Sequence, residues 1–122
     1  MKRLFGMISL MSVAAVLFFT IAALSPDAPL QFQEYVRYAS GNPATSGEVK
    51  VYLGSVFKGR ADIGPTGSYS ISGLNANFPT GTYHLFADDG VGMVGDRTCY
   101  HPQGQNPTYC DIVITTAYGP TP

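Results

Sequence analysis

The chain has 122 residues, of which only 12% are charged, and it is rich in glycine (14) and proline (9). This length suits one domain, and the abundance of turn-forming residues favours β structure over helices. The formal net charge of -1 excludes the extended basic surface with which proteins bind DNA or RNA. We therefore expect one small, turn-rich β domain without a nucleic-acid partner.

The pattern of the N-terminal segment predicts export by one of two routes. Lys2 and Arg3 precede 21 uncharged residues, 4–24. Such a run can cross a hydrocarbon core of about 30 Å as one helix, or serve as a secretory signal peptide. The basic start keeps the N-terminus in the cytoplasm and the rest outside. We therefore expect residues 1–24 to be a cleaved signal or a membrane anchor, and the protein to be extracytoplasmic, either secreted or anchored to the membrane through residues 4–24.

Residues 25–30 contain two prolines and are expected to form a stiff spacer before the domain. From there to residue 117, short runs rich in β-branched and aromatic residues alternate with Gly, Pro and Asn turns. Between Gly47 and Leu53 the apolar and polar residues alternate with the period of two that marks a half-buried strand. Strands are predicted at 32–38, 47–53, 56–63, 68–72, 82–87, 92–98 and 109–116.

These runs predict an all-β fold, an antiparallel seven-stranded sandwich of Greek-key type over residues 31–117. One apolar helix precedes it, and residues 118–122 form a loose tail.

Four segments resemble a known family. They are the strand and Gly-Asn-Pro turn of residues 36–43, the alternating strand of 47–53, and the Gly-x-Tyr runs at 67–71 and 81–85. Their order is similar to that of carboxypeptidase regulatory-like domains, which are transthyretin-like (prealbumin-like) β-sandwiches. The resemblance covers roughly residues 34–87 and implies a sandwich fold. Gly64-Pro65-Thr66 stands where the family has an acidic residue, so no role of that acid carries over.

The two cysteines, Cys99 and Cys110, are expected to form a disulfide. An even count in a small exported domain favours a structural bridge. A metal site needs more ligands at close spacing, and redox activity is typical of Cys-x-x-Cys.

The residues do not predict an enzyme or a cofactor. His84 and His101 are seventeen positions apart, and no serine lies in a Gly-x-Ser-x-Gly elbow. Hydroxyisourate hydrolases share the transthyretin-like fold, but their C-terminal Tyr-Arg-Gly-Ser is replaced here by Tyr-Gly-Pro-Thr at 118–121.

Two arrangements of side chains suggest a metal site, and neither is expected to bind a metal ion. Asp88, Asp89 and Asp96 flank a glycine-rich loop that could supply oxygen ligands to Ca²⁺. The spacing fits no EF-hand, so we expect these carboxylates to cap turns, with calcium binding left open. A copper site made by His84, His101 and Met93 is the less favoured reading, because His84 is expected on the outer face of its strand.

Exposed tyrosines are the candidate binding residues. Tyr100, Tyr109 and Tyr118 cluster around the disulfide loop and the tail, and tyrosine combines contact area with a hydrogen-bonding tip. The alternative is that they fill the core and rim. We expect a non-catalytic module that binds or scaffolds a protein or carbohydrate partner at the cell surface. The other hypothesis is a self-assembling filament subunit whose apolar N-terminal helix packs in a shared core.

Overall fold

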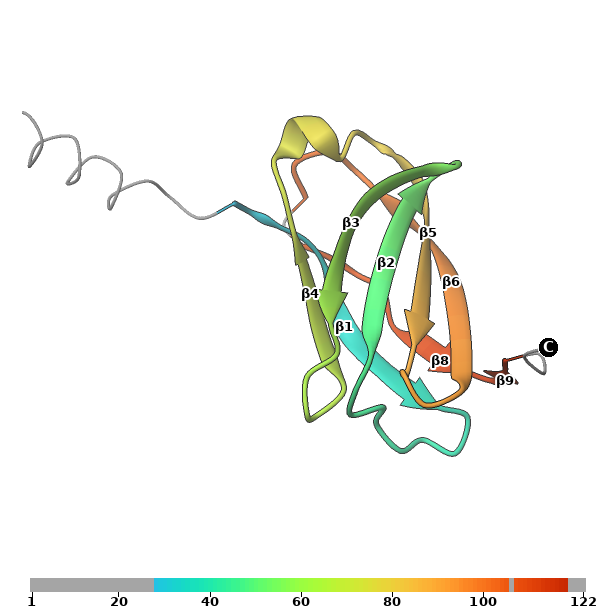
Figure 1. Ribbon diagram of the computed structural model, residues 1–122. Helices are drawn as coiled ribbons and strands as arrows, with labels where there is room; N and C mark the ends of the chain where they lie inside the picture. The colour runs from blue at the N-terminus through green and yellow to red at the C-terminus, as the bar shows by residue number, and fades with distance from the viewer. Residues whose placement is uncertain (1–27, 106, 119–122) are drawn as a thin grey trace, which may run out of the picture.

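The computed structural model describes residues 28–105 and 107–118. They form a β-sandwich of two packed sheets (Figure 1). The elements in chain order are β1 (Leu30–Tyr38), β2 (Glu48–Leu53), β3 (Val56–Asp62), β4 (Ser68–Ser72), the 3-10 turn η1 (Asn75–Asn77), β5 (Gly81–Asp88), β6 (Met93–His101), β7 (Thr108–Tyr109), β8 (Ile112–Ile114) and β9 (Thr116–Ala117). The all-β prediction is confirmed for these residues.

The larger sheet has the order β3-β2-β5-β6-β9, and all its pairs are antiparallel. The smaller sheet places β1 between β4 on one side and the short strands β7 and β8 on the other. The connections between β2 and β3 and between β5 and β6 are short, so these neighbours in sequence are also neighbours in space.

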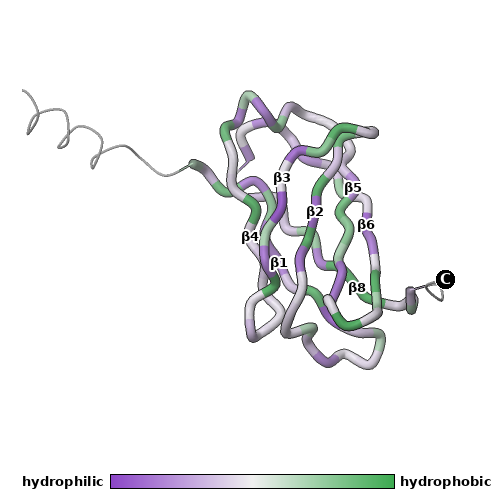
Figure 2. Tube along the Cα trace, in the orientation of Figure 1, coloured by the Kyte–Doolittle hydropathy of each residue, from purple (hydrophilic) through white to green (hydrophobic). Residues whose placement is uncertain are grey.

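The core lies between the two sheets and is built from alternate residues of each strand. On β2, Val49 and Val51 are fully buried, while the positions between them face outward, as predicted. Figure 2 shows this alternation of hydrophobic and hydrophilic positions along β2. Tyr69 and Tyr83 bury their rings, and their hydroxyls donate hydrogen bonds to backbone carbonyl oxygens of Cys110 and Pro79. Tyrosine is tolerated in such a core because its buried hydroxyl has a hydrogen-bond partner.

The last part of the chain differs from the prediction in two ways. The expected strand at 109–116 is three short strands, so the described residues form nine strands and not seven. In addition, β7 and β8 run parallel to β1, so the sandwich is not purely antiparallel. A change of sheet separates β9 from β8: β8 pairs with β1, and then Thr115 N–H donates to the carbonyl oxygen of Val94 on β6.

A close approach between the sheets accompanies this change. A Cβ on Gly95 of β6 would lie 2.1 Å from the carbonyl oxygen of Val113 on β8. Only glycine allows the two backbones to come so near.

The predicted disulfide between Cys99 and Cys110 is present, with 6.2 Å between the Cα atoms. It joins β6 of the larger sheet to the segment between β7 and β8. A bridge of this kind is typical of proteins in oxidising compartments.

The predicted leader helix (1–24), the start of the spacer (25–27) and most of the tail (119–122) lie outside the described residues. Within the described ranges, no helix is long and apolar enough to cross a membrane.

Candidate functional site

An aromatic patch covers the outer face of the larger sheet at the end where β2 turns into β3. It consists of Tyr52 on β2, Phe57 on β3, and His84 and Phe86 on β5. Residues two apart on a strand point to the same face, and the β2–β5 register aligns Tyr52 with His84. A register shift between Val51 and Tyr52 then aligns Tyr52 with Phe57. Regular pairing would have put Lys58 beside Tyr52, so this β-bulge creates the patch.

The rings of the patch contact one another mostly edge to face. The centroids of Tyr52 and Phe57 are 5.6 Å apart, and those of Tyr52 and Phe86 are 5.7 Å apart. Phe57 is 51% exposed and Phe86 is 44% exposed. A shallow groove of about 430 Å³ runs along the patch and is lined by Tyr52, Gly54, Ser55, His84 and Phe86. Exposed aromatic rings gathered on one surface are a common feature of protein interaction sites.

A polar pair borders the aromatic patch. His84 Nε2 lies 2.5 Å from Asp96 Oδ2, and the His84 ring centre is 4.1 Å from that of Phe86. The carboxylate therefore holds the imidazole against the neighbouring ring, tilted by 39° to it. This fixes the orientation of one hydrogen-bonding group at the border of an otherwise apolar surface.

The other end of the same sheet face carries charges that are paired within the sheet. Arg60 donates to Glu48 Oε2 over 2.7 Å and to Asp62 Oδ1 over 2.6 Å, and Lys50 lies 3.3 Å from Glu48. The hydrogen bond from Arg60 lowers the pKa of Glu48. Exposed pairs of this kind contribute little to stability. Because these charged groups already have partners within the sheet, the aromatic patch is the more suitable part of this face for contact with another molecule.

The structure does not bring the three predicted tyrosines together. Tyr100 is exposed on the outer face of β6, where it pairs with Thr82 beside the aromatic patch. Tyr109 is 66% exposed on the smaller sheet, next to Gln33. Tyr118 lies at the opposite end of β6 from Tyr100, with its backbone N–H donating to Gly92. Its hydroxyl donates to Asp88, and that hydrogen bond raises the pKa of Tyr118 to about 12.

Two of the three carboxylates around the glycine-rich loop, Asp88 and Asp89, cap turns as expected, whereas Asp96 does not. Asp89 is buried, and its Oδ1 accepts hydrogen bonds from the N–H groups of Val91 and Met93, while Oδ2 accepts one from the Tyr38 hydroxyl. Burial alone would raise the pKa of Asp89, but the Tyr38 and backbone hydrogen bonds lower it. Asp88 caps Gly90, and Asp96 lies away from both, beside His84.

The two histidines also lie apart, so they form no joint site with Met93. His84 is on the outer face of β5, whereas His101 is fully buried between the sheets. Among the described residues, no three His, Cys, Asp or Glu side chains are grouped so that they could hold a metal ion.

The sequence reasoning missed the aromatic patch. Tyr52 and Phe86 occupy outward positions of predicted strands, which was a usable signal for exposed aromatic residues. The contribution of Phe57 depends on the bulge, which no local pattern indicates.

The strand arrangement defines the class of fold as a transthyretin-like β-sandwich. A solved structure with this fold, 5-hydroxyisourate hydrolase from Klebsiella pneumoniae, superimposes with a TM-score of 0.52. It is 15% identical in sequence, and the match covers 74% of this chain and 97% of the hydrolase chain. At this identity the similarity concerns the fold. No protein-family model matches the chain, and no curated protein matches it.

Proposed function

We propose that this chain is an exported, non-catalytic binding module that docks a protein partner at the cell surface through its aromatic patch. The observation that carries the proposal is the exposure of Phe57 and Phe86 in contact with Tyr52 on an open sheet face. Aromatic side chains offer large contact area at a low cost in conformational entropy, and they are enriched in interface hot spots. The disulfide supports an oxidising location.

Photo-crosslinking in the native host tests the docking surface. The residue p-benzoylphenylalanine replaces Phe57 in the full chain. The control carries it at Val91, a loop position of the same domain that is even more exposed (79% against 51%), so a missing adduct there does not come from poor access. We expect a discrete adduct from position 57 that is absent from position 91 and is lost when Phe86→Ser is added. An adduct of twice the chain mass would favour the filament alternative, and no adduct at position 57 would contradict the proposal.

Export is tested separately by the intact mass and location of the native protein. A cleaved signal gives a mass that lacks the apolar segment, and a retained anchor gives the full mass in the membrane fraction. Either result agrees with export. Full-length protein in the cytoplasm with both thiols free would contradict it.

The non-catalytic part of the proposal rests on the surroundings of His84. The pair of His84 and Asp96 resembles a general base with an orienting carboxylate. Among the described residues a thiol nucleophile for it to activate is missing, however, because the two cysteines are joined in a disulfide, and His101 is buried away from the surface. The full chain is therefore expected to leave 5-hydroxyisourate unconverted above the spontaneous rate. Turnover that disappears in His84→Ala would overturn the non-catalytic assignment.

A further inference from the structure

The outer face of the smaller sheet differs in chemistry from the aromatic patch. Gln33, Tyr35 and Arg37 lie two residues apart on β1 and so share one face. Register places Ser70 and Tyr109 on either side of Gln33. We call these five residues the tyrosine face. It offers two rings, an amide, a hydroxyl and one cation.

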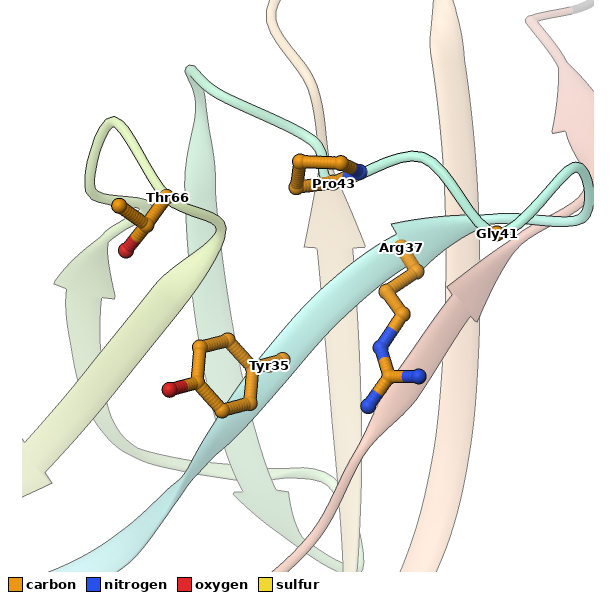
Figure 3. A pocket seen from close by; sticks show the side chains of 5 residues that line it. All are labelled: Tyr35, Arg37, Gly41, Pro43 and Thr66. Atoms are coloured by element: carbon orange, nitrogen blue, oxygen red, sulfur yellow. The ribbon is translucent and has the colours of Figure 1, made fainter.

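A hollow of about 290 Å³ lies at the end of the tyrosine face and is lined by Tyr35, Arg37, Gly41, Pro43 and Thr66. Figure 3 shows the Tyr35 ring on the side of the loop that carries Thr66, with Arg37 extending from the same strand and Pro43 on the loop that follows this strand. Tyr35 is 44% exposed. The size lies at the small end of ligand pockets, which suits one ring of a polymer lying across the sheet.

Arg37 gives the hollow its charge. Its guanidinium carbon lies 5.9 Å from the centre of the Tyr35 ring, within the range of a cation–π contact. Arg60 and Arg97 pair with carboxylates, but Arg37 forms no ion pair within residues 28–105 and 107–118. By strand alternation Glu34 points to the opposite side of β1, and Asp111 accepts a hydrogen bond from Arg97. The guanidinium fork is therefore free for a planar anion such as a carboxylate.

We propose that the tyrosine face binds an acidic polysaccharide, with a sugar carboxylate on Arg37 and the apolar face of its ring against Tyr35. The hydroxyl and amide groups of Ser70, Gln33 and Thr66 suit a ligand covered in hydroxyls better than an apolar peptide. Tyr109, one strand away, supplies a second ring for a further sugar unit. This site is on the sheet opposite the aromatic patch, so the two proposals fail independently.

Binding of the full chain to defined polymers tests the assignment. The probes are polygalacturonate, dextran sulfate and uncharged dextran, followed by affinity electrophoresis at fixed salt. We expect retardation by polygalacturonate and none by dextran. Equal retardation by dextran sulfate would support an acidic polysaccharide of either charge type, and a preference for polygalacturonate would support the carboxylate. Equal binding to uncharged dextran would overturn the role of Arg37.

A matched pair of variants separates the site from general charge. Arg37→Gln and Lys58→Gln each remove one cation, and Lys58 also forms no ion pair with another described residue but lies on β3 of the other sheet. Arg37→Gln should weaken polygalacturonate binding about tenfold or more, as expected for loss of a charge-assisted hydrogen bond, and Lys58→Gln should change it less than about twofold. Equal losses would mean non-specific attraction and overturn the proposal. Competition by anionic phospholipid vesicles for the Arg37-dependent binding would also overturn it.

Discussion

His101 Nε2 lies 2.8 Å from Gln31 Oε1 and so joins the end of β6 to the beginning of β1, across the two sheets. The Gln31 amide nitrogen donates to Gly73 and Asn75, so its oxygen faces the imidazole and accepts. Nε2 must therefore carry the proton, and Nδ1 accepts from the Thr108 hydroxyl at 2.7 Å. The buried imidazole is held neutral in one tautomer.

This arrangement predicts that acid destabilises the protein through His101. Burial lowers the pKa of His101 below its ordinary value of 6.5. As the pH falls below about 6.5, His101 binds a proton in the unfolded chain but stays neutral in the folded chain, so the free energy of unfolding decreases. Above that pH His101 is neutral in both states, so it adds nothing to the pH dependence of the free energy of unfolding. Denaturant titrations between pH 8 and pH 5 should show this decline, and His101→Asn should flatten it. An unchanged slope in His101→Asn would contradict the assignment.

The disulfide should contribute strongly to stability. Cys99 and Cys110 are separated by 11 positions, and closing a loop of that size stabilises by about 3 kcal/mol in the chain-entropy model. The double variant Cys99→Ala with Cys110→Ala should lose about that much in urea denaturation while retaining a β circular-dichroism spectrum. The native protein should also resist alkylation until it is reduced, whereas rapid labelling without reductant would show that the bridge is absent.

Gly47 is predicted to be irreplaceable, because two effects coincide there. Its φ is +102°, and a Cβ would lie 1.8 Å from the carbonyl oxygen of Asp88. Gly41 is a matched control, since its φ is +95° but its Cβ would meet nothing within 4 Å. Gly41→Ala should cost about 1 kcal/mol from backbone strain, and Gly47→Ala should cost at least about 3 kcal/mol. Equal losses in thermal melts would mean that the loop after β5 yields to the added methyl.

The two faces of β2 should respond differently to substitution. Val51 is fully buried, so Val51→Asp places an unpaired carboxylate between the sheets and should prevent folding. Lys50→Gln, one position away, removes only an exposed ion pair with Glu48 and should cost less than about 0.5 kcal/mol. Expression yield and melting curves compare the two variants, and similar damage from both would contradict the division of β2 into a buried and a solvent-facing side.

The strands up to β6 follow from local pattern. Period-two alternation in residues 47–53 identified which side of β2 is buried, and glycine-containing turns identified where strands end. The two cysteines could be paired because the chain contains no others. The candidate site was harder to foresee. Tyr100 and Tyr109 are predicted as binding residues because both lie in or beside the disulfide loop in sequence, and the structure places them on different sheets.

The sequence by itself determined the class of fold, the inward and outward faces of the early strands, and the disulfide, since each depends on residues close together in the chain. Only the tertiary structure decided that the segment after Cys110 leaves β1 for β6, and that β1 pairs in parallel with β7 and β8. It also decided that a bulge puts Phe57 beside Tyr52, and that Arg37 is free of carboxylate partners among the described residues. These outcomes depend on register between distant strands, where a shift of one residue exchanges the two faces of a sheet. Local periodicity does not indicate this register, because packing across the whole sandwich determines it.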